Sequence, residues 1–229
     1  MADRRLILLR HGQTAWNAER RAQGHSDVEL DETGHRQAAH VAPILAALAP
    51  TFVWSSDLAR SRQTGEYVAK VTGLDLRLDE RLREYHLGER TGLTMAEYAA
   101  AHPEEYRAFR AGRYDVVPGG ETTPEVVARM SECLSDALAA LAPGECGVVA
   151  GHGGALKVTL VALLGWPEHA AAGLQALVNC GWAEVADSGV VGRLRLAAYN
   201  VTAPGPPDFE TGAARPPQPR DFVSPTGVG

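Results

Sequence analysis

Apolar and polar residues alternate along this chain in blocks that predict short buried strands separated by amphipathic helices. Continuous apolar runs at 6–9, 52–54 and 147–150 are typical of strands covered on both faces of a sheet. The segments between these runs place apolar residues three or four positions apart, which predicts helices over 32–49, 57–72, 122–141 and 155–164. Further runs at 177–185 and 194–199 complete the predicted sheet.

Several residues indicate where these elements begin and end. Ser56 or Asp57 is expected to cap the second helix, and Gly73 to close it. Thr122 and Glu125 have the spacing of a capping box before the third helix. Residues 74–82 alternate apolar and charged side chains, which predicts a half-exposed or edge strand ending near Glu84.

This order of elements predicts an α/β fold, a three-layer sandwich with a central, mostly parallel sheet flanked by helices. We expect one domain over 1–200, with an excursion off the sheet at 88–121 that carries short helices over 94–101 and 104–111. Residues 201–229 form a Pro/Gly-rich tail that we expect to be disordered, since they hold seven of the fourteen prolines.

The charge and cysteine content exclude several classes of function. A net charge of −6 gives no field that would recruit nucleic acid or an anionic membrane, so any anionic ligand must be held by local basic residues. The three cysteines show no metal-binding spacing and suit buried free thiols. With no leader or membrane-spanning run in the sequence, we expect a cytoplasmic protein. A homodimer is left open.

Two predicted strands end in the same kind of sequence. Arg10-His11-Gly12 follows the first strand, and His152-Gly153-Gly154 follows the strand at 147–150. Ligands of open α/β sheets bind at the carboxyl ends of the strands, where a neutral histidine can act as a nucleophile and carry a phosphoryl group. The alternative for each is a structural histidine in a turn.

Two further residues suit chemistry on an anion at the same edge. Arg60 falls in the first turn of a predicted helix, where its guanidinium and the backbone N–H groups can face one anion. Arg62 is expected to point to solvent. Glu84 precedes a glycine-containing loop and can protonate a leaving oxygen beside a phosphate. Its alternative is a salt bridge to a nearby arginine.

Taken together, these motifs resemble the histidine phosphatase superfamily, which includes the cofactor-dependent phosphoglycerate mutases and many small phosphatases. The resemblance covers about 5–200 and rests on six groups of residues that occur in the family's order: Arg10-His11-Gly12 with Thr14 and Asn17, Gln23-Gly24, Ser56-Asp57-Leu58 with Arg60 and Thr64, Leu82-Arg83-Glu84 with Gly88 and Gly92, Pro118-Gly119-Gly120-Glu121, and His152-Gly153-Gly154.

The resemblance implies a role for each matching residue. His11 would become phosphohistidine, and Glu84 would protonate the departing alkoxide and later activate water. The transferring oxygens would be held by Arg10, Arg60 and His152, with the cradle completed by Asn17, Gln23, Gly24 and Gly153. No metal or other cofactor is required in this scheme, and the partner is a small phosphorylated metabolite.

The family contains both phosphatases and mutases, and the segment 88–121 favours a phosphatase. Mutases hold the phosphoglycerate with a lysine and an arginine pair there, whereas this chain has Met95 at the lysine place and only Arg110 from the pair. His86 and Arg110 are candidates to contact the leaving group. Segment 83–89 is similar to actinobacterial members that include glucosyl-3-phosphoglycerate phosphatases. A mutase and a non-catalytic phospholigand-binding protein are the alternatives.

Overall fold

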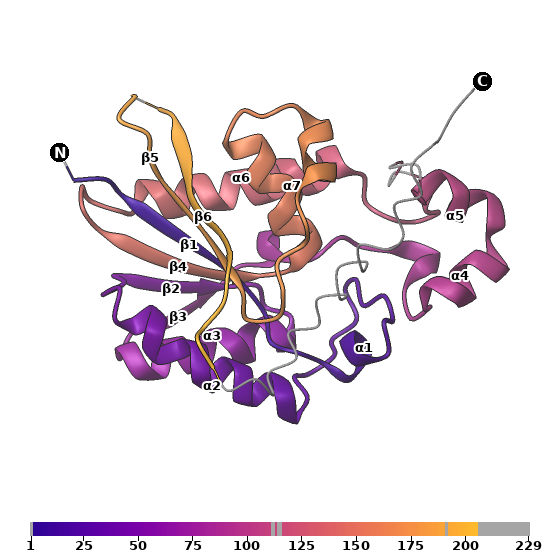
Figure 1. Cartoon of the computed structure of the whole chain (residues 1–229), viewed down its shortest axis with the longest axis horizontal. Coiled ribbons are helices and arrows are strands. Elements are labelled where there is room, and N and C mark those ends of the chain that lie inside the picture. Colours follow the sequence, from indigo (N-terminus) through magenta and orange to yellow (C-terminus); the bar gives the residue numbers. More distant parts are fainter. Residues whose placement is uncertain (1, 111–112, 114–115, 191, 206–229) are drawn as a thin grey trace, which may run out of the picture.

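The computed structural model describes residues 2–110, 113, 116–190 and 192–205. These residues form a six-stranded sheet in the order β3-β2-β4-β1-β5-β6 (Figure 1). The strands are β1 (Arg5–Arg10), β2 (Phe52–Ser55), β3 (Leu76–Leu78), β4 (Cys146–Gly151), β5 (Trp182–Asp187) and β6 (Leu194–Val201).

Four neighbouring strands of this sheet are parallel. β4 pairs in parallel with both β1 and β2, and β2 pairs in parallel with β3, whereas β5 runs antiparallel to β1 and to β6. The predicted mostly parallel sheet is therefore confirmed. Arg10 is in register with Gly151, so the residues that follow them, His11 and His152, leave adjacent strands at the same edge.

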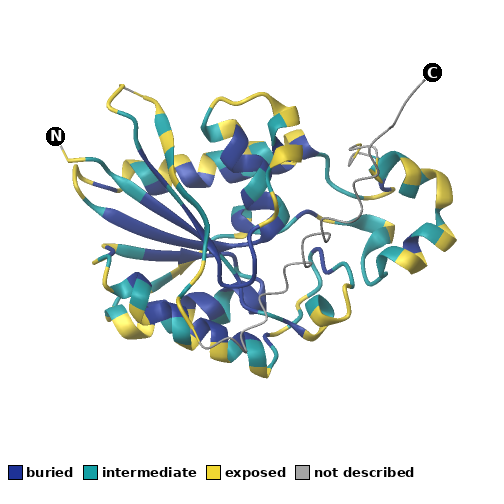
Figure 2. Cartoon of the chain, in the orientation of Figure 1, coloured by how far each residue is buried: buried dark blue, intermediate teal, exposed yellow. Residues whose placement is uncertain are grey.

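Helices cover both faces of the sheet. α2 (Glu32–Ala46) and α3 (Ala59–Thr72) lie on one face, and α6 (Thr123–Ala139) and α7 (Gly153–Leu163) lie on the other (Figure 1). Side chains alternate along β1, so Ile7 packs in the core toward α2 and Leu8 in the core toward α6. The buried layer follows the sheet and the inner helix faces (Figure 2). This arrangement confirms the three-layer α/β sandwich.

The excursion lies at the end of the sheet where the parallel strands stop (Figure 1). It carries η2 (Gly88–Arg90), α4 (Met95–Ala101) and α5 (Pro103–Arg110), and the short α1 (Ala15–Ala18) lies near it. Capping boxes begin α4 at Thr94 and α6 at Thr122, the latter as expected. The second excursion helix ends at Arg110, and position 111 of its predicted range lies outside the described residues.

The cap predicted for α3 is wrong. Neither Ser56 nor Asp57 is the N-cap residue, which is Leu58 with no side-chain hydrogen bond. Asp57 is occupied by an ion pair with Arg83, and the Ala59 N–H in the first turn donates instead to Asp27 Oδ1 (2.6 Å). The cap therefore comes from a distant loop. Gly73 closes the helix in the left-handed conformation, as expected.

Two predicted strands are shorter in the structure. The segment 74–82 forms only the edge strand β3 and then the 3₁₀ turn η1 (Glu80–Leu82), so Glu84 follows a turn and not a strand. The segment 177–181 is not a strand either, because it turns across the end of β1, where the Cys180 N–H donates to the carbonyl oxygens of Arg10 and His11.

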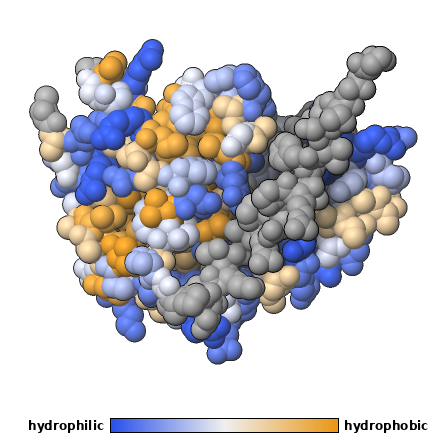
Figure 3. Space-filling view, viewed as in Figure 1, coloured by the Kyte–Doolittle hydropathy of each residue, from blue (hydrophilic) through white to orange (hydrophobic). Residues whose placement is uncertain are grey.

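The remaining expectations concern the termini and the surface. β6 extends to Val201, the first residue assigned to the tail, and 206–229 lie outside the described residues. Cys133, Cys146 and Cys180 are buried free thiols, as predicted. No helix within the described ranges is long and apolar enough to cross a membrane. Hydrophilic and hydrophobic residues are mixed over the face seen in Figure 3.

Candidate active site

A cavity of about 430 Å³ lies where β1 ends, between the sheet edge and the excursion. It brings together residues from loops that are far apart in the sequence. Seven of the nine residues given a catalytic or phosphate-binding role above line it: Arg10, His11, Asn17, Gln23, Gly24, Arg60 and Glu84. Parallel strands end at one edge of a sheet, so the topology gathers these groups at one place.

The imidazole of His11 is buried and held in one tautomer. Its Nδ1 lies 2.7 Å from the carbonyl oxygen of Gly12, and because a carbonyl only accepts, Nδ1 carries the proton. Nε2 of the neutral ring therefore keeps its lone pair. Burial lowers the pKa of His11 well below 6.5, and the charges of Arg60 and Arg10 lower it further. The ring is therefore neutral at neutral pH, a state in which an imidazole can act as a nucleophile.

Arg60 supplies a buried positive charge from the first turn of α3. Its guanidinium donates to the carbonyl oxygens of Ser26 and Gly24, each at 2.8 Å, and so holds the loop around Gln23 against the sheet. Burial lowers the pKa of Arg60 to about 10, which leaves it charged at neutral pH. Arg62 points away and pairs with Glu66, as expected.

His152 lies beside His11 but not on the cavity wall. The two ring centroids are 5.3 Å apart, and His152 is fully buried. Burial lowers the pKa of His152 well below its usual value. Both of its ring nitrogens, together with Nε of Arg10 and of Arg60, have no hydrogen-bond partner among the described residues. Buried polar atoms are normally paired, so this group suits the oxygens of a bound anion.

The two glycines after His152 let other side chains approach the start of α7. A Cβ on Gly153 would lie 3.2 Å from Nε of Arg10, and one on Gly154 would lie 2.8 Å from Oε1 of Glu84. Gly154, unlike Gly153, lines the cavity. Each glycine therefore makes room for one charged group of the site.

Glu84 is held from several sides. Its carboxylate accepts the N–H groups of Gly154 (2.9 Å), Ala155 (2.8 Å) and Tyr85 (3.0 Å). The first two belong to the N-terminal turn of α7, where helix N–H groups favour a negative charge. Among the described residues Glu84 forms no salt bridge with an arginine, the alternative considered for it.

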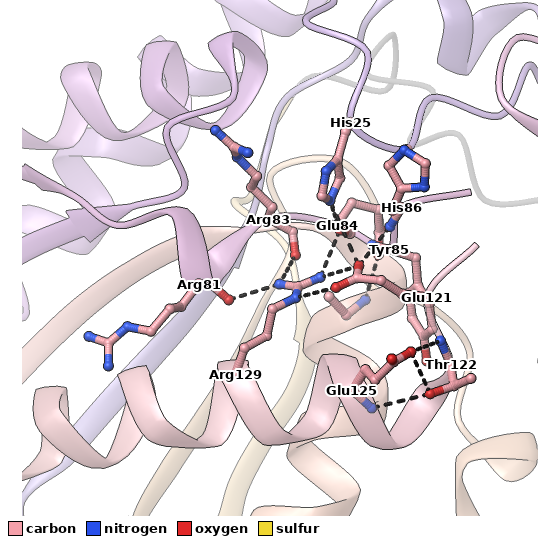
Figure 4. A network of polar contacts seen from close by, with 12 residues as sticks. His25, Arg81, Arg83, Glu84, Tyr85, His86, Glu121, Thr122, Glu125 and Arg129 are labelled. Carbon is pink, nitrogen blue, oxygen red and sulfur yellow. Dashed lines mark hydrogen bonds and ion pairs between the residues drawn. The ribbon is translucent and has the colours of Figure 1, made fainter. Parts of the chain in front are cut away.

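A guanidinium from α6 fixes the backbone of the same loop. Arg129 donates to the carbonyl oxygens of Arg81 (2.8 Å), Arg83 (2.7 Å) and Glu84 (2.9 Å), as Figure 4 shows. Its remaining N–H groups donate to both oxygens of Glu121, each at 2.8 Å. One half-buried arginine thus joins α6, the Glu84 loop and the Pro-Gly-Gly-Glu segment.

Two histidines, His25 and His86, extend this network toward the loop around Gln23 and toward Gly119. His25 Nε2 lies 2.7 Å from the carbonyl oxygen of Glu84 and donates to it (Figure 4). His86 lines the cavity, and its Nδ1 donates to the carbonyl oxygen of Gly119 (2.7 Å). His86 therefore both faces the cavity and binds the backbone, which were the two alternatives for it. Arg110 is exposed and is not part of the cavity lining.

Arg129, Asn179 and Lys157 are among the residues at the site that were not found from the sequence. Arg129 is one of many helix arginines, and nothing in the pattern distinguishes it. Asn179 lies in a segment predicted as strand, and its amide donates to the carbonyl oxygen of His11 (3.0 Å) and to Oδ1 of Asn17 (3.2 Å). Lys157 lines the cavity one helical turn after Gly153-Gly154, and this spacing was a signal that could have identified it.

The site suits an anionic ligand, and the positive charges that would bind it come from the side chains of Arg10 and Arg60. Within the described part of the chain, no group of three or more His, Cys, Asp or Glu side chains could hold a metal ion. A neutral imidazole, two guanidinium groups and a carboxylate face one cavity. These groups together can attack phosphorus, stabilise its oxygens and transfer a proton.

The chain is similar to known proteins over most of its length. The family model described as the histidine phosphatase superfamily (branch 1) matches residues 6–199. Glucosyl-3-phosphoglycerate phosphatase of Mycobacterium tuberculosis (strain ATCC 25618 / H37Rv) is 35% identical over 216 residues, covering 89% of this chain and 97% of that protein. A probable phosphoglycerate mutase of Cronobacter sakazakii is 40% identical over 184 residues, covering 79% and 83%.

A solved structure is similar over the same length. The structure of mycobacterial glucosyl-3-phosphoglycerate phosphatase in complex with VO3 has a TM-score of 0.81 and 36% sequence identity to this chain. The match covers 87% of this chain and 100% of that one.

Proposed function

Because this chain belongs to the histidine phosphatase superfamily, we propose that it is a phosphomonoester hydrolase that works through phosphohistidine and needs no metal ion. The substrate is a small phosphorylated metabolite, of the class of phosphoglycerate derivatives such as glucosyl-3-phosphoglycerate. The observation that carries the proposal is the His11 ring, whose Nδ1–H is held by the Gly12 carbonyl so that Nε2 faces the reaction unprotonated.

The reaction has two steps at one phosphorus atom. In the first, Nε2 of His11 forms the N–P bond while the ester P–O bond breaks, and Glu84 gives its proton to the departing alkoxide. In the second, Glu84 takes a proton from water as the water oxygen attacks phosphorus and the N–P bond breaks. Inorganic phosphate is released and both side chains return to their starting states.

Two guanidinium groups and a buried neutral histidine stabilise the charge that spreads over the transferring oxygens. Arg10, Arg60 and His152 carry the buried nitrogen atoms without a partner among the described residues, and these would donate to the phosphoryl oxygens. For His152 this needs a proton on the nitrogen that faces the oxygen. Asn17, Gln23, Gly24 and the Gly153 backbone complete the cradle in this proposal.

A phosphatase is favoured over a mutase by the excursion. A mutase must grip the substrate so that the phosphoryl group returns to it before water attacks. Met95 stands where mutases carry a lysine, and its sulfur contacts Arg90 within the excursion. Arg110, the remaining member of the arginine pair, is exposed outside the cavity lining.

The test is hydrolysis of an aryl phosphate in the presence of a chelator, with acid-labile phosphoenzyme trapped by rapid quench. His11→Ala should abolish both turnover and the trapped phosphoenzyme. His169→Ala, which changes an exposed histidine of η4 (Glu168–Gly173), should retain both. Turnover that survives in His11→Ala would overturn the proposal. A coupled phosphoglycerate mutase assay on the same preparations tests the alternative, and rapid mutase turnover would favour it.

A further inference from the structure

The cavity lining includes more positive charge than a single phosphoryl group requires. Arg10 and Arg60 flank His11 and are assigned above to the transferring oxygens. The rest of the lining is largely apolar, and it contains three further cations, Arg21, Arg90 and Lys157. The apolar part includes Leu87, Phe109, Val117, Val158 and Ala176.

Two of these three cations are engaged by the protein. Arg21 pairs with Glu19 and with Glu97, each at 3.1 Å. The guanidinium of Arg90 lies over the Phe109 ring, 4.3 Å from its centroid. Lys157 differs from both, since within the residues described here its ammonium has no hydrogen bond or ion pair.

The position of Lys157 on α7 directs it to the reacting centre. It follows Gly154 by three residues and Gly153 by four, so the three share one helix face. Helical side chains lean toward the helix N-terminus, which brings the lysine stem back over the turn that binds the Glu84 carboxylate. Lys157 is half-buried and lines the cavity.

An ammonium that is partly removed from water is stabilised by an anion beside it. Burial lowers the pKa of Lys157, and the negative charge of Glu84 opposes that shift. Glu84 is already bound by three N–H groups and acts on the ester oxygen in the proposed reaction. The ester oxygen is part of the leaving group. An anion that lies next to this oxygen and within reach of Lys157 is therefore also part of the leaving group.

We propose that Lys157 binds a carboxylate on the leaving group, so that the cavity selects phosphate esters of hydroxy acids over esters of neutral alcohols. This assignment rests on the proposed phosphatase function and adds to it a residue that determines specificity. The apolar part of the lining then surrounds the carbon skeleton of the leaving group. Glu84 supplies the proton to its ester oxygen, and Lys157 supplies the positive charge opposite its carboxylate.

The experiment compares two ligands that differ only at the charged group. 3-Phosphoglycerate and glycerol 3-phosphate share a three-carbon skeleton, with a carboxylate in the first and a hydroxymethyl group in the second. Their inhibition constants are measured against hydrolysis of p-nitrophenyl phosphate, so the readout does not require that either be turned over quickly. The variants are Lys157→Met, Lys157→Arg and, as matched control, Lys70→Met, which changes the other lysine of the chain, on α3.

We expect the native protein to bind 3-phosphoglycerate more tightly than glycerol 3-phosphate. Lys157→Met should reduce this ratio roughly 10- to 100-fold, the range for a hydrogen bond to a charged group. Lys157→Arg should keep most of the ratio, and Lys70→Met all of it.

The two proposals fail in different ways. An unchanged ratio in an active Lys157→Met protein would overturn the carboxylate assignment alone. Equal weakening of both ligands would also overturn it, and would place Lys157 at the phosphoryl group or at Glu84 instead. A native protein with no hydrolysis of the aryl ester would overturn the proposed function and this inference with it.

Discussion

Arg129 donates a hydrogen bond of 2.9 Å to the backbone carbonyl of Glu84, although 44 other residues separate the two along the chain and they lie on different elements. The same guanidinium binds the carbonyls of Arg81 and Arg83 and both oxygens of Glu121 (Figure 4). The loop that carries the proposed general acid is thus fixed by its backbone, while its carboxylate is fixed by the start of α7.

Replacing Arg129 with Ala should lower activity without removing any group that touches substrate. We expect a loss of kcat of roughly 10²-fold on alkyl phosphates, because a displaced Glu84 no longer supplies the acid. Aryl esters with good leaving groups should lose much less. Stability should fall by about 1–3 kcal/mol, because Glu121 and three carbonyl oxygens lose their donor.

Steady-state kinetics on the two ester classes, with urea unfolding of each variant, checks this expectation. Lys at position 129 should restore part of the stability and less of the activity, since an ammonium cannot reproduce a planar set of donors. Arg62→Ala, which breaks an exposed helix pair with Glu66, serves as control and should change neither. A uniform loss across leaving groups would argue against the positioning of Glu84 by Arg129.

Glu84→Gln tests the acid itself. The substitution keeps the size of the side chain but removes the transferable proton. We expect a loss of about 10²- to 10⁴-fold on esters with poor leaving groups and a small loss on p-nitrophenyl phosphate. The measurement is the slope of log kcat/KM against the pKa of the leaving alcohol, which should steepen in the variant. Parallel slopes in the two proteins would remove Glu84 from the proton-transfer step.

Gly154→Ala should disturb the same carboxylate from the other side. The added methyl would lie 2.8 Å from Oε1 of Glu84, so the carboxylate must move out of its hydrogen bonds to α7. We expect kcat to fall roughly 10- to 100-fold for alkyl esters, within the contribution of a positioned acid. Gly173→Ala is the matched control, because a Cβ there meets nothing within 4 Å. Full activity in Gly154→Ala would show that Glu84 works from another position.

The stability of the protein should fall on the acid side of neutrality. Burial holds the pKa values of His11 and His152 well below 6.5 in the folded state. Below pH 6.5 the unfolded chain binds protons at both residues and the folded chain does not. The free energy of unfolding therefore decreases as pH falls, by up to about 1.4 kcal/mol per histidine per pH unit, and is unaffected by these groups above pH 7.5.

Urea titrations between pH 5 and pH 8 measure this dependence. His152→Asn should reduce the slope by about one proton, whereas His169→Asn, at an exposed position, should leave it as it is. Inorganic phosphate should stabilise the folded protein, since it binds only where the site is assembled. A flat stability profile below pH 6.5 would mean that the two rings are protonated in the folded protein.

Much of the architecture follows from local patterns along the chain. The apolar runs at 6–9 and 147–150 predict strands, because four consecutive apolar residues need a partner on each face of a sheet. The polar residues at the ends of these runs then meet at one edge, and the structure places Arg10 in register with Gly151. His11 and His152 were therefore predictable as neighbours before the distance between them was known.

Two predictions from local patterns were wrong because a residue from a distant segment binds the groups concerned. Asp57 had the sequence position of a helix cap, but Arg83 binds it and Asp27 takes its place at the Ala59 N–H. Residues 177–181 had the apolar pattern of a strand, but Asn179 and Cys180 turn to bind the backbone at His11. Propensity acts within a few residues, whereas these contacts depend on the complete fold.

The sequence alone thus determined the α/β fold, the order of its elements and the chemical groups at the ends of its strands, because periodicity and strand ends are local properties. Only the tertiary structure decided that Arg129, of the twenty arginines, holds the Glu84 loop, and that Arg60 is bound to the carbonyl oxygens of Ser26 and Gly24. It likewise decided that His11 keeps its proton on Nδ1, that Glu84 rests on α7 and that Lys157 faces the cavity. Burial, tautomer and charge balance arise only when distant segments pack together.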